Sequence, residues 1–207
     1  LEIDPRGINT FTAPYEFVST MRASNCLLGP LPAKFGTARF SMPGGCVIGS
    51  RPIDLHIKGL RKLGIEITVE EGDVVGSVSA LKGARVFLGG NFGSSVLATA
   101  NVMSAACLAA GTTSIEFAAC EPEIVDLTRF LTAMGARIRG ENCHLVEIEG
   151  VRSLHGAEYT VMPDRIEAGT YLLAGAATGG DVRVTGCPPE TLLVLTDKLE
   201  ETGVRVT

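Results

Sequence analysis

One short pattern occurs three times along the 207 residues and limits the folds that the chain can adopt. In each copy the end of an amphipathic helix is followed by a glycine and then by alternating strand residues, at 60–67, 131–138 and 199–206. The copies are roughly 70 residues apart, a longer period than the about 20–50 residues of most solenoid repeats. The repeat therefore predicts an α/β fold (α+β in some schemes) in which a small βαβαββ module is used several times.

The composition is that of a globular chain with many tight turns. Hydrophobic residues make up 45% and charged residues 20%, with 25 glycines and no tryptophan, so a core can be buried. The net charge of −5 argues against a nucleic-acid or anionic-membrane partner, since both require a basic surface. The chain contains neither a long apolar run nor a charged-then-apolar leader. We therefore expect no membrane span, no signal peptide and a cytoplasmic location.

Six cysteines are scattered along the chain without a Cys-x-x-Cys pair. This distribution fits reduced, mostly buried thiols better than a disulfide framework or a zinc site. We therefore expect neither a metal nor a cofactor. The six residues are Cys26, Cys46, Cys107, Cys120, Cys143 and Cys187.

The segment 41–56 joins one of these cysteines to a cluster of charges. Cys46 lies among a proline and several glycines, which disfavour regular structure, so we expect it on a flexible, exposed loop. Arg51 follows, and Pro52 suits the first turn of a helix, which places a guanidinium beside the unpaired N–H groups of a helix start. A thiol facing such an anion site suggests an enzyme that acts on a phosphorylated or carboxylated small molecule. The alternative is a glycine-rich turn with an incidental cysteine.

Hydrophobic periodicity and turn residues predict where the helices and strands lie. A first helix is expected to open at 12–14 and to carry Phe17, Val18, Met21 and Leu28 on one face. Further helices are expected at 52–63, from a serine cap at 94–95 to 111, at 121–134, at 165–177 and from 188 to 203. Strands are expected at 1–4, 38–42, 65–69, 73–78, 84–88, 112–117, 136–138, 144–148, 158–161, 181–185 and 204–207. These elements complete two modules and begin a third.

Motifs spread over nearly the whole chain carry a family resemblance. They are Ala13-Pro-Tyr, Thr20-Met-Arg-Ala-Ser, Leu28-Gly-Pro, Pro43-Gly-Gly-Cys, the segment 49–55, the segment 108–113, Glu121-Pro-Glu-Ile-Val-Asp and Pro163-Asp-Arg-Ile-Glu-Ala-Gly-Thr. In these motifs the chain resembles the UDP-N-acetylglucosamine enolpyruvyl transferases (UDP-N-acetylglucosamine 1-carboxyvinyltransferases). The cysteine loop followed by Arg-Pro-x-Asp-Leu-His is specific to that family, and the shikimate 3-phosphate enolpyruvyl transferases are similar in fold but lack this loop.

The resemblance implies an inside-out α/β barrel of two domains, each made of three βαβαββ modules with the sheets outside and the helices within. The active site of the family lies between the two domains. On this template, residues 1–162 hold two of the three modules of the domain with the cysteine loop, and 163–207 begin the second domain. We therefore expect an internal fragment that lacks both ends, including a Lys-Asn pair, an aspartate and an arginine of the family's site, and that is inactive by itself.

The resemblance also implies a reaction, which belongs to the parent protein. The family transfers the enolpyruvyl group of phosphoenolpyruvate to the 3′-hydroxyl of UDP-N-acetylglucosamine and releases phosphate, the first committed step of peptidoglycan synthesis. Cys46 matches the cysteine that protonates C3 of phosphoenolpyruvate, can hold a covalent adduct and is alkylated by fosfomycin. Arg51 matches the arginine that binds the phosphate of phosphoenolpyruvate. The two substrates are the only partners that the resemblance implies.

The remaining matches concern the nucleotide sugar. One match to a sugar contact is Arg22. The segment that lines the uridine site in the family is matched by Pro52, Ile53, Asp54, Leu55 and His56. The helix start whose backbone N–H groups hold the diphosphate is matched by Ser94, Ser95 and Val96. Each has a simpler reading, because helix arginines are usually solvated, helix histidines are usually structural, and an aspartate in a first turn stabilises the helix dipole. The chain departs from the common pattern at Leu97, where many members have glycine, and at Gly93, where a lysine is sometimes found.

Two other functions stay open. The first is a catalytically silent paralogue or fragment that binds a nucleotide sugar without chemistry, which the departures at Gly93 and Leu97 would explain. The second is a different enolpyruvyl transferase, which would require a sugar site unlike the segment 51–56.

Overall fold

The computed structural model describes residues 1–41, 52–91 and 93–207. Cys46 and Arg51, which the sequence places in the cysteine loop, lie outside the described residues. The chain divides into two units, Leu1–Tyr159 and Thr160–Thr207, and each is described by itself.

The first module of unit 1 forms a four-stranded sheet. Its strands are β1 (Thr12–Ala13), β2 (Thr37–Ser41), β3 (Glu66–Glu70) and β4 (Asp73–Ser77), in the spatial order β1-β2-β4-β3. The first two strands run parallel, and the other two pairs are antiparallel. Helix α3 (Asp54–Lys62) connects β2 to β3.

The second module repeats this topology. Its strands are β5 (Arg85–Phe87), β8 (Thr112–Glu116), β9 (Arg137–Arg139) and β10 (Leu145–Glu149), in the order β5-β8-β10-β9, again with one parallel and two antiparallel pairs. A small hairpin of β6 (Gly89–Gly90) and β7 (Gly93–Ser94) leads into helix α4 (Val96–Ala106), and α5 (Pro122–Ala133) connects β8 to β9. The predicted βαβαββ module is therefore confirmed for both sheets of unit 1, although its first strand lies at Thr12–Ala13 and not at 1–4 as expected.

The leucine and glycine of each repeat end a helix in the same way. Gly64, Gly135 and Gly203 all have φ near +90°, at 96°, 98° and 88°. The residue after each glycine donates its backbone N–H to the carbonyl of the repeat leucine, at 3.1, 2.9 and 3.1 Å. This is the hydrogen bond of a Schellman motif, which glycine favours because it has no Cβ to strain at positive φ. The motif reverses the chain from each helix into the segment that follows it.

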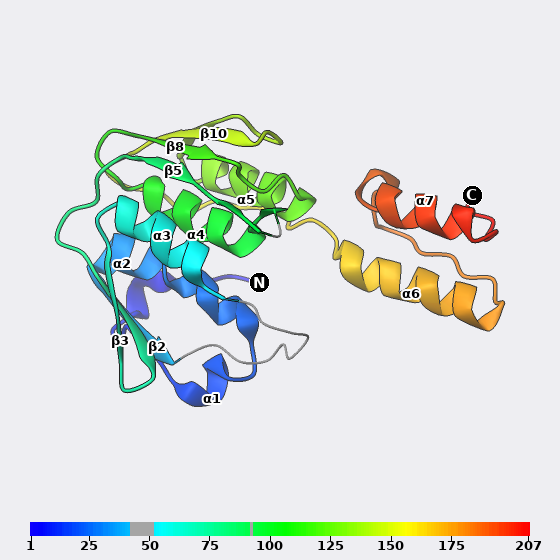
Figure 1. Cartoon of the computed structure of the whole chain (residues 1–207), viewed down its shortest axis with the longest axis horizontal. Coiled ribbons are helices and arrows are strands. Elements are labelled where there is room, and N and C mark those ends of the chain that lie inside the picture. The colour runs from blue at the N-terminus through cyan, green and yellow to red at the C-terminus, as the bar shows by residue number, and fades with distance from the viewer. Residues whose placement is uncertain (42–51, 92) are drawn as a thin grey trace. The chain divides into compact units, whose positions relative to one another are not determined.

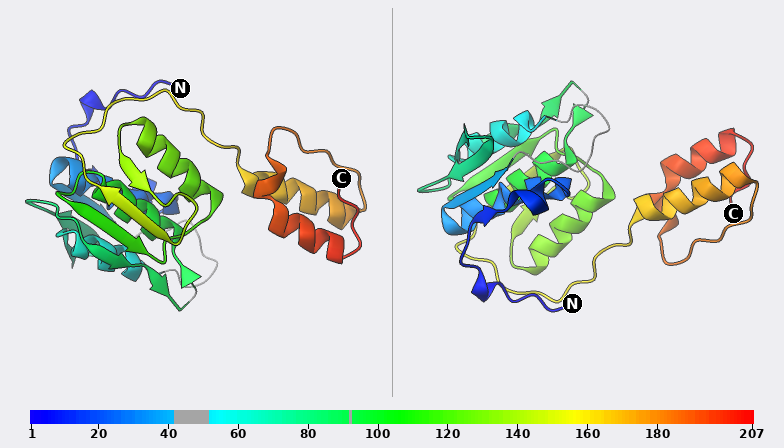
Figure 2. Two further views of the ribbon diagram at one scale, coloured as in Figure 1. Left: turned by 90° about the horizontal axis from the view of Figure 1, so that it is seen from above. Right: turned by 90° about the horizontal axis from the view of Figure 1, so that it is seen from below.

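Helices α2, α3 and α4 of unit 1 lie between its two sheets, as Figure 1 shows with β5, β8 and β10 above these helices and β2 and β3 below. Seen from above, the strands of the second sheet lie in front of the helices (Figure 2, left). Helix α4 is buried around most of its circumference, as expected for a helix that is apolar and small-chained on every face. It crosses α3 so closely that a Cβ on Gly59 would lie 2.5 Å from Val102 Cγ2.

The long first helix expected from 12–14 onward is wrong. The segment instead forms α1 (Tyr15–Val18), the 3-10 helix η2 (Arg22–Leu27) and α2 (Pro30–Phe35), after a short 3-10 helix η1 (Pro5–Gly7). Met21 is extended, with φ −135° and ψ 109°, and its carbonyl accepts a hydrogen bond from the Ser24 hydroxyl at 2.7 Å. This local bond competes with helix continuation. Val18 and Leu28 are buried as expected, but Phe17 and Met21 are 62% and 54% exposed.

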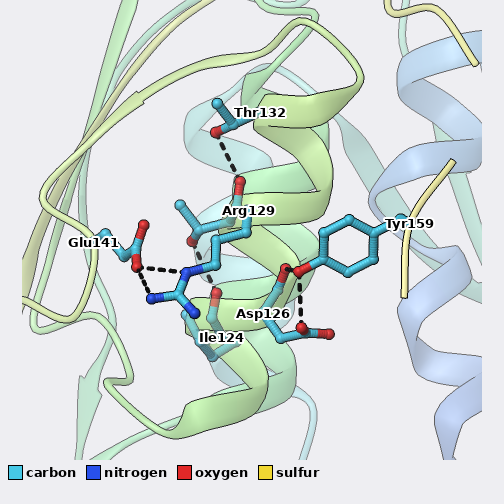
Figure 3. Close-up of polar contacts among 7 residues, drawn as sticks. Ile124, Asp126, Arg129, Thr132, Glu141 and Tyr159 are labelled. Carbon is cyan, nitrogen blue, oxygen red and sulfur yellow. Dashed lines mark hydrogen bonds and ion pairs between the residues drawn. The ribbon is translucent and has the colours of Figure 1, made fainter. Parts of the chain in front are cut away.

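The segment after β10 is tied to α5 rather than paired in a sheet, so the strand expected at 158–161 is wrong. The Tyr159 hydroxyl donates to Asp126 Oδ1 at 2.8 Å, and the backbone N–H of His155 donates to the Met134 carbonyl at 2.9 Å. Figure 3 shows Tyr159 beside Asp126, and Arg129 of the same helix paired with Glu141. These two bonds hold the segment against α5, and residues 158–161 pair with no strand in the described part of the chain.

Unit 2 consists of helices. Asp164 caps α6 (Arg165–Thr178) by accepting the N–H groups of Ile166 and Glu167, at 2.8 and 3.1 Å. The 3-10 helix η3 (Pro189–Thr191) and α7 (Leu193–Glu201) follow. Residues 181–185 and 204–207, expected as strands, are not in a sheet, and neither are residues 1–4 of unit 1. A strand requires a neighbouring strand for its backbone hydrogen bonds, and residues 160–207, all of them described, contain none.

The described residues of both units include no helix whose length and apolar character would let it cross a bilayer.

The repeat glycines give a test of the fold. Replacing Gly64 with alanine (Gly64→Ala) puts a Cβ on a residue at φ +96°, 3.3 Å from the Ala80 carbonyl oxygen. We expect the free energy of unfolding, measured by urea denaturation, to fall by about 1–2 kcal/mol. The matched control is Gly7→Ala, where a Cβ has no neighbour within 4 Å. Equal effects of the two substitutions would contradict the role assigned to the repeat.

Candidate functional site

The described candidate residues lie on three segments of unit 1. Arg22 is the first residue of η2, the segment 52–56 precedes and begins α3, and Ser94–Val96 lead into α4. Cys46 and Arg51, which the sequence analysis predicts to be catalytic, lie in 42–51, outside the described residues.

The start of α4 is formed by a serine cap, as the sequence predicted. Ser95 Oγ accepts the backbone N–H of Ala98 at 3.3 Å, and the Ser95 carbonyl accepts the N–H of Thr99 at 2.9 Å. Ser94 precedes the cap as the last residue of β7 and pairs with Gly89. The side chains of Ser94 to Val96 are partly exposed. This arrangement can present the amide end of the helix dipole to an anion.

The start of α3 alternates exposed and buried residues. Pro52 and Asp54 are exposed, whereas Ile53 and His56 are buried in the core. Leu55 lies against the β6–β7 hairpin, since a Cβ on Gly90 would be 3.2 Å from Leu55 Cδ1. Of this segment, Asp54 therefore offers an accessible charged group, and Ile53 and His56 hold the helix in place from below.

The carboxamide of Asn101, in the middle of α4, joins three of the surrounding segments. Its Nδ2 donates to the Asn25 carbonyl at 2.7 Å and to His56 Nδ1 at 2.8 Å. Its Oδ1 accepts the backbone N–H of Gly29 at 2.7 Å. Asn101 is 1% exposed, so α4 is hydrogen-bonded to η2, to the start of α2 and to α3 inside the core.

His56 is neutral in this environment. Burial, helped by the nearby Arg22 guanidinium and partly opposed by Asp54, lowers the pKa of His56 to about 4. The charges of Arg22 and Asp54 thus act on the same buried ring, which shows that the fold brings these three candidate residues together.

Sequence reasoning missed Asn101. A polar residue within the small apolar helix sequence of 96–106 is the signal that could have indicated it, because a buried amide requires partners. Gly29 was predicted only to end or bend a helix. A Cβ at this position would lie 2.2 Å from the Asn101 carbonyl oxygen, so the glycine is required by the close approach of two backbones.

A hollow of about 650 Å³ runs along the exposed face of α3. It is lined by Asp54, Ile57, Lys58, Arg61 and Lys62. Only Asp54 among these residues is a candidate, so the hollow does not define the site.

The expectation of mostly buried thiols is wrong for the cysteines that the structure describes. Cys107 is buried, and burial raises its pKa to about 12, but Cys143 is exposed and Cys26, Cys120 and Cys187 are partly exposed. Cys120 and Cys143 lie in connections next to α5 and β10 rather than in the core. All five are free thiols, and the described ranges contain no cluster of three or more ligand side chains that fits a metal ion.

The sequence matches the EPSP synthase (3-phosphoshikimate 1-carboxyvinyltransferase) family over residues 2–207. Two curated relatives are named UDP-N-acetylglucosamine 1-carboxyvinyltransferase. The protein from Methylacidiphilum infernorum (isolate V4) is 54% identical over 195 residues, which cover 94% of this chain and 46% of the relative. The protein from Idiomarina loihiensis is 52% identical over 205 residues, which cover 99% of this chain and 48% of the relative. The chain spans about half the length of these curated relatives.

Two solved structures share the fold. The enolpyruvyl transferase NikO from Streptomyces tendae aligns with a TM-score of 0.72 and 21% identity, over 93% of this chain and 46% of that chain. The EPSP synthase from Acinetobacter baumannii aligns with a TM-score of 0.52 and 25% identity, over 76% of this chain and 34% of that chain. These matches confirm the fold class predicted from the repeat.

Because His56 is neutral in the folded chain, we expect the protein to lose stability as the pH falls. The unfolded chain binds a proton at this histidine near its ordinary pKa of about 6.5, and the folded chain does so only near 4. The resulting stability is therefore present above about pH 6.5 and is lost as the pH falls toward 4. From the difference between the two pKa values, we expect the protonation of His56 to lower the free energy of unfolding by about 2–3 kcal/mol between pH 7.5 and pH 4.5.

The measurement is urea unfolding at pH 7.5 and 4.5, for the wild type and for His56→Asn. Asparagine keeps an acceptor for Asn101 but does not titrate, so the difference in pH dependence between the two proteins isolates His56. An identical pH dependence would show that His56 is protonated equally in the folded and unfolded chains.

Proposed function

The chain belongs to the EPSP synthase (3-phosphoshikimate 1-carboxyvinyltransferase) family, and from this membership we propose that the protein is a UDP-N-acetylglucosamine enolpyruvyl transferase. It transfers the enolpyruvyl (1-carboxyvinyl) group of phosphoenolpyruvate to the 3′-hydroxyl of UDP-N-acetylglucosamine and releases phosphate. This reaction would supply an early precursor of peptidoglycan and hence of the bacterial cell wall, in the cytoplasm.

The observation that carries the proposal is the contrast in identity among its relatives. Identity exceeds 50% over nearly the whole chain with two proteins named for UDP-N-acetylglucosamine. It is half as high or less with two enolpyruvyl transferases that have other names. A shared fold alone would not favour one acceptor, but this contrast favours the nucleotide sugar.

The described segments suit a nucleotide sugar. The capped start of α4 offers backbone N–H groups to a diphosphate, and Arg22 supplies a guanidinium on the neighbouring η2. Asp54, exposed at the start of α3, can accept hydrogen bonds from the N–H of the base or the hydroxyls of the ribose. We place Pro52 to His56 along the uridine and Ser94 to Val96 along the diphosphate.

The chemistry requires a proton donor and a phosphate ligand, and we assign these roles to Cys46 and Arg51. The Cys46 thiol gives its proton to C3 of phosphoenolpyruvate, which makes C2 electrophilic, and the sugar 3′-hydroxyl adds to C2 as it loses its own proton to a base. Phosphate then leaves C2 while C3 loses a proton, so the double bond forms again. Arg51 holds the phosphate through its planar fork of donors. A free thiol has a pKa of about 8.5, which an arginine or a helix start lowers, so the group can donate near neutral pH.

Glycine suits the backbone at position 93, where the chain departs from the family pattern. Gly93 has φ +94° in the β6–β7 hairpin, a conformation in which a lysine side chain would be strained. Leu97 is partly exposed in the first turn of α4. The departures at Gly93 and Leu97 leave the Ser95 cap of α4 intact. They therefore change side chains near the proposed diphosphate site but not the backbone N–H groups at the start of α4.

The test of this function is phosphate release by the full-length protein in the presence of both substrates. We expect Cys46→Ser to reduce turnover at least a hundredfold, because general acid catalysis contributes about 10²–10⁴-fold and a hydroxyl is a far weaker acid than a thiol. Binding of UDP-N-acetylglucosamine, measured by calorimetry, should change little. Cys46→Asp restores an acid and should retain turnover while escaping alkylation by fosfomycin.

The matched control is Cys143→Ser, which changes an exposed thiol outside the proposed site and should leave turnover unchanged. A wild-type protein that binds UDP-N-acetylglucosamine but releases no phosphate would instead be the catalytically silent nucleotide-sugar-binding paralogue. A serine variant with nearly normal turnover would remove Cys46 from the mechanism.

A further inference from the structure

We infer that Asn101 is a positioning residue of the nucleotide-sugar site, which holds His56 in the neutral form protonated on Nε2 and fixes the substrate-contacting segments against α4. This inference rests on the proposed function, because the segments are assigned to the nucleotide sugar there. Asn101 does not itself belong to any of the motifs that carry the family resemblance.

Two backbone groups fix the orientation of the Asn101 carboxamide. The Asn25 carbonyl can only accept a hydrogen bond, so the carboxamide atom 2.7 Å from it is the NH₂ group. The Gly29 N–H can only donate, so the atom 2.7 Å from it is the oxygen. The amide cannot be flipped without placing two donors together and two acceptors together.

The tautomer of His56 follows from that orientation. The NH₂ group of Asn101 lies 2.8 Å from His56 Nδ1, so this ring nitrogen must be the acceptor. The ring proton of the neutral imidazole is therefore on Nε2. Both side chains are buried, at 1% and 3% exposure, so water does not replace a lost bond at little cost.

The hydrogen bonds of Asn101 reach each segment close to a proposed contact. Asn25 lies in η2, the short helix that Arg22 begins, and His56 lies in the first turn of α3, which Asp54 begins. Asn101 itself is in the helix that Ser95 caps. One buried side chain therefore sets the mutual positions of the groups proposed to bind the base, the sugar and the diphosphate.

Burial is the main cause that keeps His56 neutral, and the two nearby charges act on the ring in opposite directions. Arg22 disfavours a proton on the ring, and Asp54 favours one. Burial adds to the effect of Arg22, so in the wild type the ring stays neutral throughout the physiological pH range.

The experiment replaces the Asn101 amide by a carboxylate of the same shape (Asn101→Asp) in the full-length protein. The carboxylate can pair with His56 only if Nδ1 carries a proton, so the pKa of His56 should rise above its ordinary value of about 6.5. In ¹⁵N spectra, the wild-type ring should show an unprotonated Nδ1 and a protonated Nε2 from pH 5.5 to 8. The variant should show an imidazolium at pH 6 that titrates at higher pH.

The binding of UDP-N-acetylglucosamine gives the second readout. In Asn101→Asp we expect its Kd to rise roughly tenfold at pH 8, because a carboxylate oxygen then faces the Asn25 carbonyl and neither can donate. We expect the Kd to recover partly at pH 6, where the protonated histidine balances the buried carboxylate. The wild-type Kd should not show this dependence. The double variant Asn101→Asp with His56→Asn should lose the pH dependence, since no group at position 56 then titrates.

Two further variants separate positioning from a general loss of stability. Ser104→Ala on the same helix removes a hydroxyl whose partner among the described residues is the Ala100 carbonyl, and the Kd of this variant for UDP-N-acetylglucosamine should be unchanged. In Asn101→Ser the new side chain is too short to reach Asn25 and His56 together. This variant should bind UDP-N-acetylglucosamine roughly tenfold more weakly at both pH values.

A wild-type spectrum with the proton on Nδ1, or with an imidazolium at pH 7, would overturn the inference, and this result does not depend on any variant folding. An unchanged Kd in both Asn101 variants would also overturn it. A wild type that does not bind UDP-N-acetylglucosamine would refute the proposed function instead. In that case the tautomer of His56 in the wild-type spectrum would still show whether Asn101 controls the ring.

Discussion

The close approach of helices around α4 is the constraint on which the rest of unit 1 depends. A Cβ at Gly29 would lie 2.2 Å from a backbone oxygen of α4, and a Cβ at Gly59 would lie 2.5 Å from a side chain of the same helix. Segments packed too closely to admit a Cβ leave no room for water, so a polar group between them depends on protein partners. Asn101 meets this requirement for itself, for the Gly29 N–H and for one nitrogen of His56.

This packing links the fold to the proposed site. The two sheets bury α4, and its capped end carries the residues proposed to hold a diphosphate. The segments that begin with Arg22 and Asp54 are hydrogen-bonded to the middle of the same helix. A helix that is buried and fixed on several sides is a rigid support, which suits a site that must hold a flexible, charged ligand in one position.

The two modules of unit 1 share a strand topology but differ in their connections, among them the link from the second strand to the following helix. In the second module the link from β8 to α5 consists of residues 117–121, and it is fixed to α4 by the Ala119 N–H bonded to Thr99 Oγ1 at 3.1 Å. The corresponding link of the first module, residues 42–53, is longer and contains Cys46 and Arg51. The modules thus provide the scaffold, and the proposed chemistry belongs to an extension of one of them, as is common for loops on rigid folds.

The sequence by itself determined the features that depend on neighbouring residues. The Schellman ends at Gly64 and Gly135 and the caps by Ser95 and Asp164 could be predicted because their hydrogen bonds span only a few residues. Arg22, Asp54 and the start of α4 were found through motifs, and the fold brings Arg22 and Asp54 together around His56. Only the tertiary structure decided the absence of strands at 158–161 and 181–185 and the role of Asn101. These features depend on partners far away in sequence or on the lack of one: a strand needs a second strand, and the Asn101 amide bonds residues 45 to 76 positions away.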